Sequence, residues 1–439
     1  MSADLRLARL LVLGSDRHEW WRIVLTALGA LLATGFALTA VVLASLRGWH
    51  DVGIAHGLLD RPGERQGVVT ALLLLLIPVF GFLGQCARIG AVHRDRRLAG
   101  LRLAGASPWQ VRRIAGAEAG LTCLAGSVVG TVFSVLVLLV RWGSPSVWAW
   151  AGIALVAVAV PVVGALVSVL ALRRVVASPL GWVRRVRPRR GPGVLFVLGV
   201  LLFVGAALGA YAALSDGPGG RSGASGPLLV FVLLVATGTA VLWLAGATAR
   251  LTGAWLAART DDAAVLIAAE RLRADPWAAA RTHAAVLLVT LTGTAFVGIR
   301  RSLLDVLDKP QYLDRAFYTT GLDLTAAAIG VALAITLLSL AVGTAESLAS
   351  RRRGLAAQAA AGVPRAVLGR ALLLETALPL APAVLLAGLG GMAIGTGYGS
   401  VPWAALLVPV GVYAVCLLTA ATSLPFLRRT LRPEELRYA

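Results

Sequence analysis

Residues 94–118 read RDRRLAGLRLAGASPWQVRRIAGAE, and the same pattern returns at residues 351–375 as RRRGLAAQAAAGVPRAVLGRALLLE. Each copy has a basic cluster, an Ala/Leu-rich stretch, a glycine, a proline, and a glutamate thirteen residues after the glycine. The aligned pairs include Gly105 with Gly362, Arg113 with Arg370, and Glu118 with Glu375. Because each copy lies between two long apolar segments, the repeat predicts a charged docking surface between membrane spans rather than an active site.

The glycine and the proline of each copy predict its local shape. Glycine readily adopts the left-handed conformation that ends a helix, and proline is favoured in the first turn of the next helix. Ser107-Pro108 is typical of an N-cap followed by a first helical residue, and Val363-Pro364 places a proline at the same helix start. We therefore expect two helical hairpins, the first hairpin (residues 94–118) and the second hairpin (residues 351–375).

Composition places these hairpins in a membrane protein. Of the 439 residues, 58% are hydrophobic and 14% are charged, and the mean hydropathy is +0.82. No soluble globular domain needs so much apolar surface. The net charge of +20 lies mainly in segments beside apolar stretches. It therefore indicates membrane orientation, with lipid and no nucleic acid as a partner.

Ten apolar segments are long enough to span a bilayer, which requires about 20 residues. They are residues 22–46, 67–90, 117–140, 148–172, 193–214, 226–249, 281–299, 322–345, 372–396 and 402–427. With the N-terminus inside, the cytoplasmic segments hold 32 of the 41 basic residues. The positive-inside rule then predicts that both termini of this multi-pass protein are cytoplasmic. The basic residues are forty arginines and one lysine, which is typical of GC-rich codon usage and indicates a bacterial cell membrane.

The expected fold is an all-α polytopic membrane protein of about ten transmembrane helices, built as two parallel four-helix units plus a two-helix spacer. We expect no cleavable signal peptide. In chain order, we expect an interfacial amphipathic helix (1–21), a first four-span unit (22–172), a basic cytoplasmic linker (173–192), a spacer hairpin of two spans (193–249), a cytoplasmic linker and amphipathic helix (250–280), a second four-span unit (281–427) and a cytoplasmic tail (428–439).

The sequence offers no pattern for catalysis or cofactor binding. Lys309 is the only lysine and does not follow the glycines of a phosphate-binding loop. The cysteines lie far apart, which favours structural thiols, and His50 and His56 have no third metal ligand nearby. The interiors of the spans lack ionisable residues, which disfavours an ion-coupled carrier because such carriers need titratable groups near the midplane.

At the repeated residues the sequence resembles the FtsX-like (MacB-type) permease family of ABC transporters. The matching residues are Arg94, Arg96, Leu98, Arg102, Gly105, Ala106, Arg113 and Glu118 in the first copy, and Arg351 to Arg353, Leu355, Gly362, Val363, Arg370 and Glu375 in the second. The ending LRPEEL at residues 431–436 also resembles the family. Three features depart from its pattern. Arg97 and Gly354 replace a glutamate, Ala359 replaces an arginine, and the outer loops 47–66 and 300–321 are too short for the large extracytoplasmic domain of many relatives.

The resemblance implies that the hairpins contact a separate ATPase subunit on the cytoplasmic side, which is expected to be a dimer and to carry ATP and Mg²⁺. This chain is then a non-catalytic permease subunit with no cofactor of its own. The residues implied in coupling are Arg94, Arg96, Arg97, Arg102, Gly105, Pro108, Arg113, Glu118, Arg351, Arg352, Arg353, Gly362, Pro364, Arg370 and Glu375.

Given the short outer loops, we expect the cargo to be a lipophilic or amphipathic molecule that is exported, such as an antibiotic, a peptide or a lipid-like compound. A signalling permease that transmits ATPase motion without cargo, and an ion-coupled carrier, remain alternatives. Whether one chain or a homodimer completes the complex stays open.

Overall fold

Each long described helix overlaps one of the apolar segments above, the short helix at Ala263–Ala274 lies between two of them, and no strand occurs among the described residues. The computed structural model describes residues 17–46, 48–49, 57–60, 62–86, 100, 103–142, 146–171, 198, 201–202, 205, 226–308, 315–399 and 402–425. Within these residues, nine helices are long and apolar enough to cross a membrane. The expected all-α polytopic fold is therefore confirmed.

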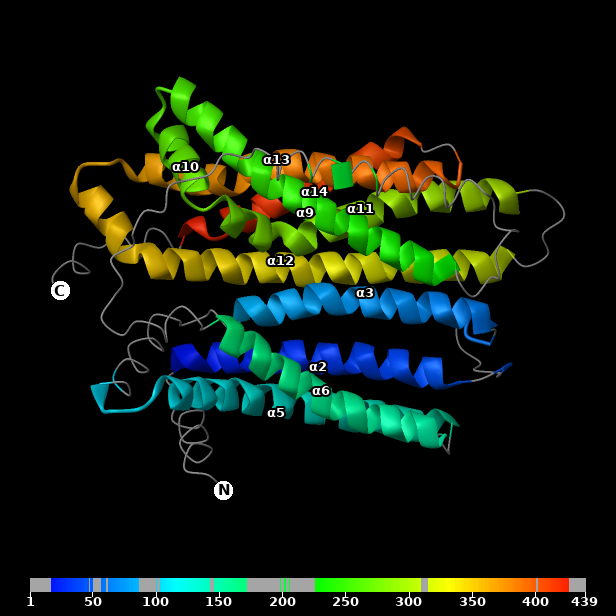
Figure 1. Ribbon diagram of the computed structural model, residues 1–439. Helices are drawn as coiled ribbons and strands as arrows, with labels where there is room; N and C mark the ends of the chain where they lie inside the picture. The colour runs from blue at the N-terminus through cyan, green and yellow to red at the C-terminus, as the bar shows by residue number, and fades with distance from the viewer. Residues whose placement is uncertain are drawn as a thin grey trace. The chain divides into compact units, whose positions relative to one another are not determined.

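The chain divides into two compact units, one of Met1–Val52 and Leu59–Pro188, the other of Gly53–Leu58 and Arg189–Ala439. The helices of the first unit are α2 (Arg17–Ser45), α3 (Pro62–Cys86), α5 (Pro108–Trp142) and α6 (Val147–Ala171). Those of the second are α9 (Gly226–Arg259), α10 (Ala263–Ala274), α11 (Pro276–Leu307), α12 (Arg315–Ala360), α13 (Arg365–Thr396), the short 3₁₀ helix η2 (Trp403–Leu406) and α14 (Leu407–Ala421) (Figure 1).

In the first unit, small residues let α5 lie directly against α2. A Cβ atom added at Gly126 would stand 2.0 Å from the carbonyl oxygen of Ala27, so only glycine fits there. Beside it, the Thr34 hydroxyl donates to the Ser127 hydroxyl at 3.1 Å. Small residues and buried hydroxyls are the usual means by which helices associate in a membrane.

The second unit repeats this arrangement. Its first long helix in the repeat, α11, packs most extensively against α13, as α2 packs against α5. A Cβ atom at Gly391 of α13 would stand 2.4 Å from the carbonyl oxygen of Leu291, again leaving room only for glycine. Helices α9 and α10 pack against α11 and α13, so the described part of the expected spacer joins the second unit.

Most helices differ in length from the expected spans, and three of them illustrate how. Helix α12 continues through the basic cluster to Ala360, whereas its span was expected to end at residue 345. Helix α9 continues to Arg259 instead of residue 249, and α2 already begins at Arg17. An apolar segment ends where charged residues begin. A helix can continue through them when they are arginines among alanines, because arginine and alanine both favour helix.

Some expectations fall outside the described residues. They include most of the interfacial helix 1–21, most of the span 193–214, of which only residues 198, 201–202 and 205 are described and all are helical, the linker 173–192 and the tail 428–439. The three cysteines are buried and free, in agreement with structural thiols.

Candidate coupling hairpins

Both repeated glycines have the backbone conformation that glycine favours. Gly105 has φ 95° and Gly362 has φ 92°, which lie in the left-handed region. The residue before each glycine donates its N–H to the carbonyl four residues earlier, at 2.9 Å in both copies. The two turns therefore share one geometry, as the repeat predicts.

The second hairpin closes with a complete helix-ending motif. The N–H of Val363 donates to the carbonyl of Gln358 at 3.1 Å, and the N–H of Gly362 donates to that of Ala359 at 3.1 Å. This pair of bonds satisfies the last carbonyls of α12. Below the turn, Leu348, Leu355 and Leu368 form a buried cluster against which Val363 packs, so the end of α12 is fixed to the start of α13.

The two helices that follow the turns begin at equivalent residues, Pro108 and Arg365. In the first hairpin, the N–H of Gln110 donates to the Ser107 hydroxyl at 3.2 Å, while the Gln110 side chain accepts from the Ser107 N–H at 2.8 Å. This is a capping box, and Pro108 is the first helical residue as expected. In the second hairpin Pro364 lies one residue earlier, at the N-cap, and makes no side-chain capping bond.

Glu118 is buried and ion-paired within the first unit. Only 4% of the residue is exposed, and its carboxylate accepts a hydrogen bond from the guanidinium of Arg22 near the start of α2. Val111, equivalent to Leu368, is also fully buried on the same helix. The first repeated glutamate therefore holds α5 to α2 and is shielded from solvent.

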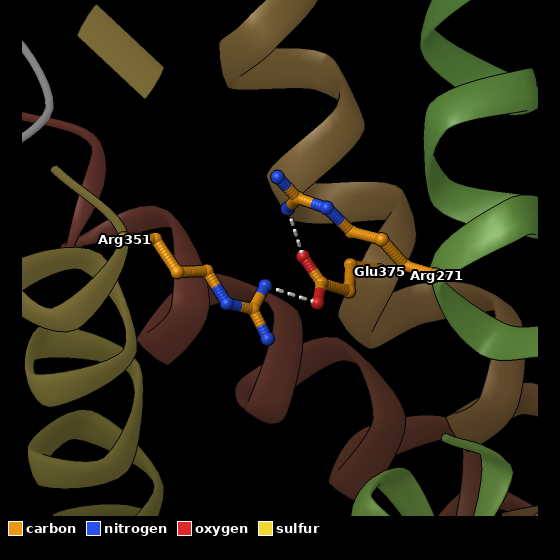
Figure 2. Close-up of polar contacts among 3 residues, drawn as sticks. All are labelled: Arg271, Arg351 and Glu375. Atoms are coloured by element: carbon orange, nitrogen blue, oxygen red, sulfur yellow. Dashed lines mark hydrogen bonds and ion pairs between the residues drawn. The ribbon is translucent and has the colours of Figure 1, made fainter. Parts of the chain in front are cut away.

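Glu375 bridges two arginines from two other helices, and its side chain is 23% exposed (Figure 2). Its Oε2 atom accepts from Arg271 of α10 at 2.6 Å, and its Oε1 atom accepts from Arg351 of α12 at 2.5 Å. The second repeated glutamate thus ties the restarted helix both to its own hairpin arm and to the short helix α10.

A second ion pair joins α10 to α13. The guanidinium of Arg370 lies 2.9 Å from the carboxylate of Asp262, which also caps α10 by accepting from the N–H groups of Ala264 and Val265. These backbone hydrogen bonds, with the nearby charge of Arg370, hold the pKa of Asp262 below its usual value. Helix α10 is therefore attached near both of its ends to the first turns of α13.

The remaining residues implied in coupling lie as follows. Gly105, Arg113, Arg351, Gly362, Pro364 and Arg370 are exposed. Arg352 and Arg353 lie in α12 and Pro108 in α5, without described side chains, and Arg94, Arg96, Arg97 and Arg102 fall outside the described residues.

The sequence analysis missed Arg22, Asp262 and Arg271. Only Asp262 had a local signal, since an aspartate before an apolar helical run is typical of an N-cap.

The described residues contain no group of three His, Cys, Asp or Glu side chains that could hold a metal ion. What the geometry offers instead is the same glycine turn twice, each followed by a helix whose repeated glutamate is ion-paired to a neighbouring helix of its unit.

Residues 68–180 match the family described as FtsX-like permease C-terminal, which covers α3, the first hairpin, α5 and α6. The chain thus contains an FtsX-like permease domain in its first unit, in agreement with the resemblance seen at the repeat. No curated protein matches the chain. Members of this family are generally non-catalytic membrane subunits that work with ABC ATPases.

Proposed function

We propose that this chain is the permease subunit that couples ATP hydrolysis, by a separate ATPase subunit, to export of a lipophilic or amphipathic molecule. The observation that carries the proposal is the duplicated hairpin, whose turn has the same geometry in both units. Two identical protomers of an ATPase would need such a pair of matching protrusions, one for each.

The bracing of each hairpin supports a mechanical role. Glu118 connects the first hairpin to α2, and Glu375 connects the second to α10 and α12. A push on either tip would therefore be transmitted to other helices of the same unit and would not be absorbed by a flexible loop. The arginine bias described above predicts that both hairpins lie on the cytoplasmic side, where ATP is available.

The short outer connections support a substrate that is reached from the bilayer. Only residues 46–61 separate α2 from α3, and only residues 308–314 separate α11 from α12. Neither stretch is long enough to form a domain that could grip a soluble target outside the membrane. A lipophilic or amphipathic molecule needs no such domain, because it partitions into the membrane itself.

The test is to reconstitute the chain in lipid vesicles, alone and with an ABC ATPase subunit that co-purifies with it. Alone, the chain should neither bind nor hydrolyse ATP. Together, the two proteins should hydrolyse ATP and move labelled amphipathic peptides or lipids across the membrane.

Hydrolysis that follows the isolated chain through purification would contradict the proposal. Coupled hydrolysis without movement of any cargo would favour the signalling alternative. Transport that persists without the ATPase would favour an ion-coupled carrier.

A further inference from the structure

The two hairpin tips differ at two equivalent positions. The first hairpin exposes Leu103, at 77%, and Trp109, at 64%. The second hairpin has Ala360 and Ala366 at the aligned positions, and both are exposed as well. The same backbone therefore presents two large apolar side chains on one tip and none on the other.

Trp109 is the first residue of the apolar stretch Trp109–Val140 of α5, which is longer than a bilayer is thick. Its 32 residues rise about 48 Å, whereas the hydrocarbon core is about 30 Å thick. With Val140 at one face of the core, Trp109 lies about 17 Å beyond the other face. The interfacial layer adds only about 5–8 Å on each side of the hydrocarbon core. Two arginines, Arg112 and Arg113, lie between Trp109 and that boundary. A protein surface is therefore the occupant that fits this tip.

The first tip has the chemistry of a binding hot spot. Tryptophan is among the residues that most often carry binding energy at interfaces, where a large apolar side chain fills a pocket and a polar rim excludes water. Exposed Arg113 supplies a basic rim beside Trp109. The complementary surface is an apolar pocket with acidic residues at its edge.

The second tip has different means of contact. Its exposed residues are small or basic, with Pro364 and Arg365 at the helix start. Exposed charges contribute little to affinity because solvent and salt screen them. This tip is instead held in position by the Glu375 bridge.

We propose that the hairpins bind the ATPase unequally, with Leu103 and Trp109 of the first hairpin filling an apolar pocket that supplies most of the affinity. The second hairpin then orients the bound ATPase and adds little to its affinity. This inference rests on the function proposed above, and it adds that one of the two units is the principal attachment point.

The test measures binding of the purified ATPase to the full-length chain in nanodiscs. Leu103→Ala combined with Trp109→Ala gives the first tip the side chains of the second, and should raise Kd at least tenfold. Arg365→Ala on the second tip should raise Kd less than threefold. Equal losses from the two tips, or less than a threefold loss from the first, would overturn the proposal.

A matched gain-of-function variant uses the same equivalence. Ala360→Leu combined with Ala366→Trp gives the second tip the side chains of the first, and both sites are exposed, so folding should not suffer. This variant should bind the ATPase at least threefold more tightly than the unchanged chain. An unchanged Kd would contradict the inference that the second tip binds weakly because it has alanine at these two positions.

Two controls separate the possible failures. If the unchanged chain does not bind the ATPase, the proposed function fails and not only the inference about the tips. If the truncated first tip binds normally, and a bimane label at position 109 is quenched by brominated lipid, then Trp109 contacts the membrane and the inference is wrong.

Discussion

Glu118 and Glu375 occupy the same position in the repeat but experience different surroundings. Glu118 shares a buried site with one arginine, whereas Glu375 is partly exposed and shares two. Removing one partner of a buried ion pair leaves an uncompensated charge, which costs far more than breaking an exposed pair. The same substitution should therefore have unequal effects in the two copies.

We expect Glu118→Gln to lower the free energy of unfolding by about 3 kcal/mol, because Arg22 would stay buried without a counter-charge. Glu375→Gln should cost about 1 kcal/mol, since its arginines keep access to water. Unfolding by SDS titration in mixed micelles measures both values. The matched control is Glu270→Gln, which breaks an exposed pair with Arg273 and should cost less than about 0.5 kcal/mol.

The Arg22→Gln and Glu118→Gln double variant gives a second check on the buried pair. Because it removes both charges, it should be more stable than the sum of the single effects predicts. Additive effects would contradict a direct interaction between the two side chains.

Only some residues of these ion pairs could be predicted from the sequence. The glutamates themselves stood out because they recur at a fixed distance from a glycine. Arg351 stood out with them, but Arg22 and Arg271 did not, because Arg22 lies 96 residues from Glu118 and Arg271 lies 104 residues from Glu375. Pairing over such distances is decided by how helices pack, which local sequence patterns do not reveal.

At the scale of the elements, the turns were predictable and the helix lengths were not. Glycine and proline act on the backbone locally, so Gly105, Gly362 and Pro108 could be assigned from the sequence alone. The end of α12 could not, because a basic cluster stops a membrane span without stopping a helix. The restart of α13 differed by a single residue, with Pro364 at the cap.

The turn conformation leads to a prediction about the hairpins. A side chain at Gly105 or Gly362 would meet no neighbouring atom within 4 Å, so any penalty comes from the positive φ alone. We expect Gly105→Val and Gly362→Val to cost about 1–2 kcal/mol each in the local turn. ATP turnover coupled to transport should fall while membrane insertion stays normal.

The control for this prediction is Gly105→Asn and Gly362→Asn, because asparagine tolerates the left-handed region far better than valine. The asparagine variants should keep most of the coupled activity. If the valine and asparagine variants behaved alike, the backbone conformation of the turn would not matter for coupling.

At the scale of the whole molecule, the orientation in the membrane follows from arginine placement. Because most arginines lie in the segments assigned to the cytoplasm, cysteines placed at Gly57 and Gly219 should react with an impermeant thiol reagent from outside intact cells. Cysteines at Ala99 and Ala357 should react only after permeabilisation. The three native cysteines are buried and should give little background. Reversal of either pair would show that the arginine bias misplaces the hairpins.

Composition and the repeat were sufficient to predict an all-α polytopic membrane fold, because both are properties of the whole chain and do not depend on particular contacts. The described helices agree with nine of the ten expected spans in number and order. The association of α9 and α10 with the second unit was not foreseen. It depends on contacts such as the edge-to-face packing of Trp243 against Trp277, at 5.7 Å between ring centroids.

Helix α12 connects the second hairpin to the far end of its membrane span. Its 46 residues rise about 69 Å, and its last turns bend away from the long straight part (Figure 1). From the expected membrane boundary at Ala345, about 22 Å extend to the hairpin and about 45 Å extend across the bilayer. If both parts of α12 move as one body about that boundary, its arms are those of a lever in a ratio of roughly one to two. A small displacement of the hairpin would then be doubled, with half the force, at the other end of the helix.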